Sequence, residues 1–416
     1  MTKNTENDFD IIVIGGGPSG MMTAGRAGEL GKKVLLLEKN KDLGEKLKIT
    51  GGGRCNITNA ELDTRVLLKN YGPAEQFLYS PFSQFGVKET FDFFEKRGLP
   101  LVVQAHKRAF PQTEKSSDVF KVMEKYIENG GVIIKTDSPV SKVLKEAGKI
   151  IGVKVGNKIY SARSYVIATG GISHKETGST GDGFNWLREL GHKVKSPTPT
   201  IVPLAVKELW VKSLSGVSLS FMKITFYADG VKKFSKTGKL LFTHFGLSGP
   251  LILNSAGKVS DLLRSGTVTA KIDAYPDTDI VELEKKIIKV FDDNKNKMLK
   301  NVLDEVVPHG TTKAILSLLK NIDLDIKVHS VTKETRKNLV ALLKALPLTV
   351  TSLMGFDRAV VTDGGVDLNE MDMKTMKSKI FENLFVTGDL LHISRPSGGF
   401  SLQLCWTTGF IAGSNA

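Results

Sequence analysis

The sequence predicts an α/β fold in which a parallel sheet covered by helices is divided between the two ends of the chain and interrupted by two inserts. A βαβ pattern with a glycine-rich turn opens the chain, and further buried-strand patterns end in glycine near its middle and its C-terminus. The segment between them alternates strands and turns and then changes to helical periodicity, which indicates a β-rich and then a helical insert. At roughly 100–200 residues per domain, the 416 residues correspond to two or three domains.

The first element is a glycine-rich turn between a strand and a helix. Residues 9–14, FDIIVI, form a short apolar run typical of a buried parallel strand, and residues 21–30 are compatible with a helix. Between them, Gly15, Gly17 and Gly20 of GGGPSG match the pattern G-x-G-x-x-G. Such glycines permit a tight turn and let the backbone approach a pyrophosphate, which the N–H groups of the helix N-terminus would bind.

The second strand completes this pattern. Residues 34–37 end in Glu38, 18 residues after Gly20, and its carboxylate would accept hydrogen bonds from ribose hydroxyls. The complete βαβ pattern predicts a Rossmann-type dinucleotide-binding domain, and a glycine-rich turn without a ligand is the less favoured interpretation. We expect the dinucleotide contacts of this region at Gly15, Gly17, Pro18, Ser19, Gly20, Glu38 and Lys39.

Segments distant in the sequence favour FAD over NAD, because FAD also needs contacts along its ribityl chain and its isoalloxazine. Residues 165–171, YVIATGG, and residues 384–389, LFVTGD, each read as a strand followed by glycine, and a further strand is expected over residues 132–140. Glycines 398–399 precede a predicted last helix, residues 400–412, whose N-terminus would face the N1/O2 edge of the flavin. The contacts expected from these segments are Val140, Thr169, Gly170, Gly388, Asp389, Gly399 and Phe400.

Composition excludes several classes of protein. Hydrophobic residues make up 41% and charged residues 25%, close to the globular average, which excludes a disordered chain, a collagen and a coiled coil. No stretch approaches about 20 consecutive apolar residues and no secretory signal is evident, so we expect no membrane association and a cytoplasmic location. Two cysteines are too few for a disulfide framework or a cysteine-ligated metal centre, and no metal site is expected.

The net charge of +14 is unevenly distributed. Residues 191–350 hold 25 Lys and Arg against 15 Asp and Glu. This excess indicates either a solvated, lysine-rich surface or a polyanionic partner such as RNA, and the two interpretations stay open. A cluster on a probable hairpin would likewise be a solvated face or an edge that contacts phosphates: Lys232, Lys233, Lys236 and Lys239.

Four further blocks make the chain similar to a known family. They are TGGGRCNITN (50–59), ATGGISHKETGSTGDGF (168–184), LLFTHFGLSGP (240–250) and residues 359–391. On these blocks the chain resembles the YhiN/BaiN-like FAD-dependent oxidoreductases, also described as aminoacetone oxidase family FAD-binding proteins. The resemblance spans nearly the whole length. It departs after Gly388, where GDLLHISRPSGGFSLQ carries Arg-Pro in place of a common acidic–Gly pair.

The resemblance implies a glutathione-reductase-like FAD-binding domain that is split by the inserts. Its two parts would be residues 1–195 and 352–416. The β-rich insert would comprise residues 196–275 and 346–351, and the helical insert residues 276–345.

One group of candidate catalytic residues lies in the glycine-rich segment of the first block. Gly53 and Arg54 can approach the pyrophosphate or the flavin closely, and Arg54 is the natural partner of an anion. Cys55 would contact the cofactor and act as a general acid that protonates a carbon while hydride arrives on its neighbour. The alternative for Cys55 is a small buried packing residue.

Three other residues are candidates for the site or for the core. His244 would face the substrate or cap a strand at a domain interface. Arg395 would hold an anionic or carbonyl-bearing substrate, or face solvent. Cys405 is expected on the apolar side of the last helix, in the core.

The electron donor and the substrate follow from the same reasoning. No second strand–GxGxxG–helix unit occurs, so NADPH or NADH would dock transiently at the flavin and react in a ping-pong scheme. The resemblance implies, as first hypothesis, reduction of the C5=C6 bond of a uridine in 23S ribosomal RNA to dihydrouridine, with ribosomal RNA as partner. The alternatives are a reductase or oxidase of a small molecule, such as a steroid-like enone or an amine, and a non-catalytic flavin-binding module.

Overall fold

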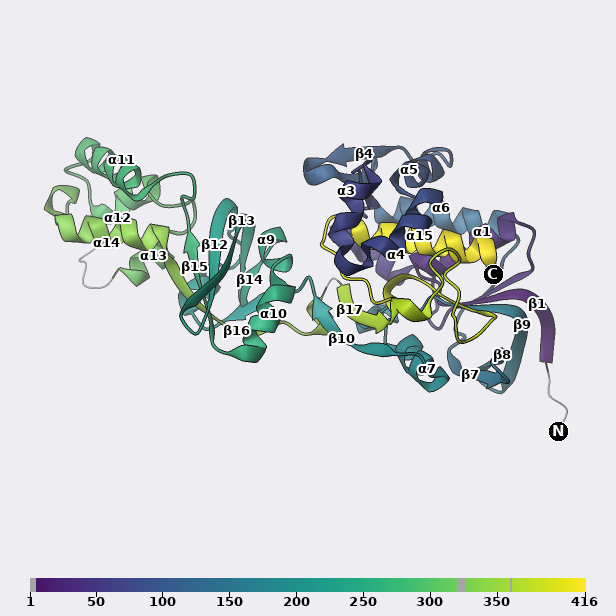
Figure 1. Ribbon diagram of the computed structural model, residues 1–416. Helices are drawn as coiled ribbons and strands as arrows, with labels where there is room; N and C mark the ends of the chain where they lie inside the picture. Colours follow the sequence, from purple (N-terminus) through teal and green to yellow (C-terminus); the bar gives the residue numbers. More distant parts are fainter. Residues whose placement is uncertain (1–4, 320–325, 360) are drawn as a thin grey trace. The chain divides into compact units, whose positions relative to one another are not determined.

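The computed structural model describes residues 5–319, 326–359 and 361–416, and it divides the chain into two compact units (Figure 1). Unit 1 comprises residues 1–199 and 360–416, and unit 2 comprises residues 200–359. No helix within the described ranges is long and apolar enough to cross a membrane.

Unit 1 is built on a seven-stranded sheet with the order β6-β2-β1-β9-β8-β7, in which β18 also pairs with β9. The strands are β1 (Thr5–Ile14), β2 (Val34–Leu37), β6 (Ile133–Lys135), β7 (Val140–Glu146), β8 (Lys149–Val155), β9 (Lys158–Ile167) and β18 (Leu384–Val386). The pairs of β1 with β2 and β9, and of β9 with β18, are parallel. The carboxyl ends of these four strands therefore meet at one edge of the sheet, where doubly wound folds bind their ligands.

Helices cover this sheet and bury its apolar strands. The helices of unit 1 are α1 (Pro18–Glu29), α2 (Glu45–Ile49), α3 (Thr64–Leu68), α4 (Glu75–Gln84), α5 (Val87–Glu95), α6 (Ser116–Asn129), α7 (Asp182–Leu190) and α15 (Phe400–Asn415). Helix α15, yellow in Figure 1, packs beside α1 and carries buried residues on every side, from Leu402 to Gly413. A helix that is apolar all round belongs in the centre of a core.

Two smaller sheets complete unit 1. One joins β3 (Thr58–Asn59), β5 (Arg108–Pro111) and β4 (Leu101–Gln104), and the other pairs β10 (Val194–Thr200) with β17 (Val361–Val366). The single strand expected over residues 132–140 is wrong, because β6 ends at Lys135 and β7 begins at Val140. Asp137, with φ of 48°, breaks the extended backbone between them.

Unit 2 contains a closed antiparallel barrel with the order β11-β14-β13-β12-β15-β16. Its strands are β11 (Leu204–Val206), β12 (Ser218–Ala228), β13 (Val231–Thr243), β14 (Gly246–Ser248), β15 (Val268–Asp273) and β16 (Leu346–Leu353). Its helices are α8 (Leu209–Ser213), α9 (Pro250–Leu253), α10 (Ala256–Ser265), α11 (Ile280–Asp293), α12 (Leu299–Val302), α13 (Thr312–Leu318) and α14 (Lys333–Lys344). Strands and helices of this unit contribute to one hydrophobic cluster, which includes Ile224, Phe242, Ile287 and Leu343.

Candidate functional site

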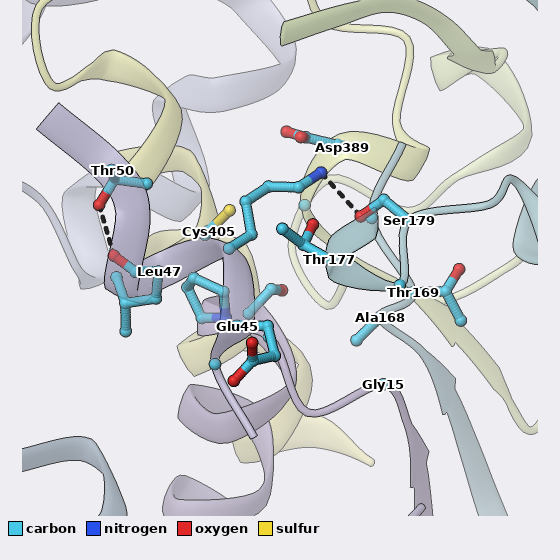
Figure 2. Close-up of a pocket in the computed structure, with 18 of the residues that line it drawn as sticks. Gly15, Glu45, Leu47, Thr50, Ala168, Thr169, Thr177, Ser179, Asp389 and Cys405 are labelled. Atoms are coloured by element: carbon cyan, nitrogen blue, oxygen red, sulfur yellow. Dashed lines mark hydrogen bonds between the residues drawn. The ribbon is translucent and has the colours of Figure 1, made fainter. Parts of the chain in front are cut away.

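A cavity of about 950 Å³, part of which opens to solvent, lies in unit 1 where β1, β9 and β18 end. Figure 2 shows Gly15 and Thr169 on the strand side of this cavity and Asp389, Thr177 and Ser179 around the same space. The segments that line it come from the turn after β1, from α2, from residues 168–179 and from the start of α15.

The turn between β1 and α1 depends on its glycines. Gly15 has φ of 107°, and a Cβ atom there would lie 2.6 Å from the carbonyl oxygen of Ala168. A Cβ atom on Gly20 would lie 1.8 Å from the carbonyl oxygen of Gly15, so α1 can pack this close to the end of β1 only because position 20 is a glycine. At Gly17, by contrast, a Cβ atom would meet nothing within 4 Å, because this residue lines the cavity at the N-cap of α1.

The carboxylate of Glu38 closes the same turn. Its Oε2 accepts a hydrogen bond from the backbone N–H of Gly16 at 2.7 Å, and its Oε1 accepts one from the N–H of Asn40 at 2.8 Å. Each carboxylate oxygen has a second lone pair for a ligand hydroxyl. Glu38 also lines a second cavity of about 410 Å³, next to Val140 and Trp186.

The two cavities share part of their lining, namely Gly15, Glu38, Thr169 and Gly178, so they are neighbours along one extended path. Lys39 lines the second cavity and forms an ion pair of 2.9 Å with Asp182. Such a path, from an apolar end past a carboxylate and a helix N-terminus, suits the adenine, ribose and pyrophosphate of a dinucleotide.

Three buried hydroxyls test whether a polar cofactor fits the larger cavity. The side chains of Ser19, Thr169 and Thr387 have no hydrogen-bond partner in the described parts of the chain, and all three residues line the cavity. A buried hydroxyl without a partner loses free energy of about 1–3 kcal/mol, so such groups normally have a partner. The phosphate and hydroxyl oxygens of FAD would supply partners to all three, and these residues therefore fit FAD.

Lys46 places a cation in the cavity that the sequence reasoning did not identify. Its Nζ donates hydrogen bonds to the carbonyl oxygen of Ser173 at 2.6 Å and to the hydroxyl of Ser179 at 2.7 Å. Burial lowers the pKa of Lys46, whereas Asp389 and Cys405 counteract this shift. A pyrophosphate would stabilise the charged ammonium further. The sequence shows only a lysine in the run GEKLKI, which reads as a solvated helix face.

At the other end of the cavity, Asp389 and the first turn of α15 are held together by Arg395. The buried guanidinium forms an ion pair with Asp389, and its Nε donates to the hydroxyl of Ser401 at 3.0 Å. Its Nη1 donates to the carbonyl oxygen of Ile393 at 2.7 Å. Asp389 and Ser401 line the cavity, whereas Arg395 lies behind them with its donors engaged inside the protein.

Several residues expected to contact the cofactor line the cavities, and others lie behind the lining. The cavity residues are Gly15, Gly17, Pro18, Ser19, Glu38, Lys39, Val140, Thr169, Gly170, Gly388 and Asp389. Gly399 packs against Thr58, and the ring of Phe400 makes an edge contact with Tyr71. At α15 the cavity is lined by Ser401, Leu402 and Cys405 instead.

Cys405 was expected in the core, but its side chain lines the cavity (Figure 2). Burial and the negative charge of Asp389 raise the pKa of this thiol to about 12. Cys405 lies one helical turn after Ser401, so its side chain faces the same cavity. The sequence does not reveal this orientation, because the helix is apolar on all sides.

The loop around Cys55 lies behind the cavity wall. Cys55 is fully buried, its backbone N–H donates to the carbonyl oxygen of Thr50 at 3.0 Å, and burial raises the pKa of its thiol to about 12. Thr50 lines the cavity. Gly53 is exposed, and Arg54 forms an ion pair of 3.3 Å with Glu114.

His244 belongs to unit 2, whereas the cavity is formed by unit 1 alone. The histidine is exposed in the turn between β13 and β14, with its ring 4.9 Å from that of Phe245.

The parallel sheet, the glycine turn and the cavity define a Rossmann-type FAD-binding protein of the FAD-dependent oxidoreductase class. More particularly, the chain belongs to the HI0933-like family, because the family model described as the HI0933-like protein Rossmann domain matches residues 9–415.

Two relatives extend over nearly the whole chain. It is 27% identical to a 3-dehydro-bile acid delta(4,6)-reductase of Clostridium scindens, with 98% of each chain covered. It is also 27% identical to a ribosomal RNA dihydrouridine synthase of Haemophilus influenzae, with 99% of this chain and 98% of the relative covered.

A solved structure shows the same fold. The 3-ketosteroid-delta4-(5alpha)-dehydrogenase of Rhodococcus jostii, in complex with 4-androstene-3,17-dione, superimposes with a TM-score of 0.56 at 14% identity. The match covers 99% of this chain and 97% of that one.

Proposed function

We propose that this protein is an FAD-dependent reductase that converts a uridine of large-subunit ribosomal RNA to dihydrouridine, with NADPH or NADH as electron donor. The observation that carries the proposal is the charge of unit 2, which holds 24 Lys and Arg against 16 Asp and Glu in 160 residues. A basic surface supplies the phosphate contacts from which RNA-binding proteins draw much of their affinity. The relative from Haemophilus influenzae is named for this reaction.

The residues of unit 1 would hold the cofactor from one end to the other. Glu38 would accept from the ribose, Gly17 and the α1 N-terminus would bind the pyrophosphate with Lys46, and Asp389 would accept from the ribityl chain. When bound, FAD supplies two-electron hydride chemistry, and the protein supplies orientation and a proton.

The proposed reaction consumes one NAD(P)H and one proton and saturates the C5=C6 bond of uracil. Hydride is added at C6 and the proton at C5, and NAD(P)+ is released. Cys55 is the proposed proton donor, because its raised pKa keeps the thiol protonated at neutral pH and its partner Thr50 lines the cavity. The contacts of Arg395 with Ser401 and Asp389 favour a role in positioning these two residues over the predicted contact with substrate. His244 remains a predicted substrate contact from unit 2.

The decisive experiment is a map of dihydrouridine in ribosomal RNA from a strain that lacks the gene. We expect one dihydrouridine of the large-subunit RNA to disappear and to return when the gene is restored. An unchanged modification pattern in the deletion strain would refute the proposed substrate.

Reduction of a small-molecule enone is the second candidate, and the full-length similarity to a bile acid reductase favours it. Purified holoprotein separates the two. Ribosomal RNA should stimulate NAD(P)H oxidation in the first case, and a 3-ketosteroid enone without RNA should do so in the second.

A further inference from the structure

Three successive rows of paired residues cross strands β13, β12 and β15 on the side of the barrel that faces away from its core, and a β-bulge extends them by a fourth row on β13 and β12. Thr237, Lys223 and Asp273 form one row, Ser235, Thr225 and Lys271 the next, and Lys232, Tyr227 and Thr269 a third. The alternate residues of β12, namely Met222, Ile224, Phe226 and Ala228, are buried. Because side chains alternate along a strand, the three rows share the outer face.

A β-bulge adds the fourth row. Leu219 pairs with Leu240 and Met222 with Gly238, so two residues of β12, Ser220 and Phe221, oppose Lys239 alone. Lys239 is exposed, and residue Phe221 is 49% exposed. Each of the four rows therefore carries one lysine. We call Lys239, Lys223, Lys271 and Lys232 the lysine ladder.

The lysine ladder is not neutralised by acidic neighbours. Within residues 5–319, 326–359 and 361–416, none of its four ammonium groups forms an ion pair with a carboxylate. Asp273, the acidic residue in these rows, is paired with Lys344 at 2.8 Å.

Lys236 lies on the same hairpin but does not belong to the ladder. It pairs with Ile224 on the inner side, donates to the carbonyl oxygen of Asn254 at 3.0 Å, and is half-buried. The structure therefore divides the lysine cluster of the hairpin, and it adds Lys271 from a strand distant in sequence.

Aromatic rings accompany these cations. The ammonium of Lys271 lies 5.4 Å from the ring centre of Tyr227, and Lys232 is directly opposite Tyr227 on β13. At the other end of the face, Phe221 lies in the bulge that opposes Lys239. Positive groups that follow a backbone and exposed rings that stack on bases are the two features shared by single-stranded nucleic acid sites.

We propose that the lysine ladder binds a single-stranded segment of RNA, with phosphates at the lysines and bases against Tyr227 and Phe221. The proposal rests on the proposed function for the identity of the RNA as substrate. Directly opposite residues lie about 5 Å apart and successive outward residues of one strand about 7 Å apart, so the ladder offers a charge for each of several consecutive phosphates. An anionic membrane would be attracted too, but the large exposed apolar side chains of these strands are Phe221 and Val231 alone.

The test compares two triple variants of the full-length holoprotein. Lys223→Gln, Lys232→Gln and Lys271→Gln together remove three charges from the ladder. Lys285→Gln, Lys289→Gln and Lys295→Gln remove the same charge from exposed positions at or after α11 in the same unit. Binding of a fluorescein-labelled single-stranded oligouridine is followed by anisotropy as a function of salt.

The slope of log binding constant against log salt concentration should become shallower by about 2 in the ladder variant, since each lost phosphate contact changes it by about 0.7. If the variant and the wild type bind equally at 1 M salt, this change in slope corresponds to roughly 100-fold weaker binding by the variant at about 0.1 M salt. Tyr227→Ala should weaken binding by about 10-fold with an unchanged slope. The matched control should bind with nearly the wild-type slope, and replacing the ladder lysines by arginine should preserve binding.

Equal losses in both triple variants, no loss in either, or preferential binding of the wild type to phosphatidylserine vesicles would each overturn the inference. Loss of binding in the arginine variant as well would do the same, since it would indicate a folding defect. The proposed function is tested separately. A deletion strain complemented with the ladder variant that regains full dihydrouridine refutes the ladder alone, whereas unchanged dihydrouridine in the deletion strain refutes the proposed function alone.

Discussion

Replacing Gly17 by alanine should separate cofactor binding from folding, because there is room in the protein for a methyl side chain at this position. Its backbone is extended, with φ of −77° and ψ of −177°, which any residue can adopt. An added Cβ atom would meet no protein atom within 4 Å and would project where the cavity meets the N-terminus of α1.

The expected free energy of unfolding of the cofactor-free variant stays within about 1 kcal/mol of the wild type. Alanine restricts the unfolded chain, which stabilises the folded protein by about 0.4–1 kcal/mol. Alanine is also a poorer N-cap residue than glycine by a similar amount, so the two effects largely offset each other. For a unit of this size, the melting temperature should shift by less than about 4 °C. Affinity for FAD should fall about 10- to 150-fold, because a displaced phosphate loses a charge-assisted hydrogen bond of about 1.5–3 kcal/mol.

The assay titrates cofactor-free protein with FAD and follows the quenching of flavin fluorescence, with thermal melts of the same samples. Gly20→Ala is the contrasting variant, since its Cβ atom would lie 1.8 Å from the carbonyl oxygen of Gly15 and must distort the turn. Wild-type affinity for FAD in Gly17→Ala would show that the pyrophosphate does not lie at this residue.

Three further predictions concern charges and thiols. Lys46→Met should weaken FAD binding by about 10-fold or more through loss of a charge-assisted contact, while Lys48→Met on the same helix should not; equal titration curves for both variants would contradict this role. Arg395→Gln should lower the free energy of unfolding by about 1.5–3 kcal/mol because it removes the charge-assisted hydrogen bond to Asp389, and adding Asp389→Asn should restore part of this loss in denaturant titrations. The folded-state pKa of Cys55 is raised to about 12, so the stabilisation from its buried neutral thiol is present below the unfolded pKa of about 8.5 and is lost as the pH rises towards 12. Urea titrations between about pH 8 and 11 should show a decline that is shallower by up to about 1.4 kcal/mol per pH unit in Cys55→Ala, and identical slopes would refute the shift.

The glycine turn and Glu38 were predictable because their interactions are local. A buried strand, a turn and a helix follow one another within residues 9–38, and steric limits on the turn leave few alternatives to glycine. The strands that end at Ile167 and Val386, just before Thr169 and Gly388, were also recognisable, since a fully buried parallel strand is a continuous apolar run. Their convergence on one edge follows from parallel pairing.

Other features were decided only by packing between distant segments. From the sequence, Cys405 was expected in the core and Lys46 was not singled out, because the sequence pattern does not record which side of a helix faces a cavity. The sequence does not show whether Arg395 binds a substrate or an aspartate, because its charge suits both. The conformation of the loop before α15 directs its guanidinium towards Asp389. In unit 2, only the strand pairing separates Lys236 from the ladder and brings Lys271 into it.

The sequence by itself thus determined the class of fold and the cofactor turn, since these depend on short-range sterics and periodicity. The tertiary structure decided which charges, thiols and hydroxyls share the cavity and which lysines share a sheet face. The physical reason is that the direction and solvation of a side chain depend on neighbours contributed by segments hundreds of residues away.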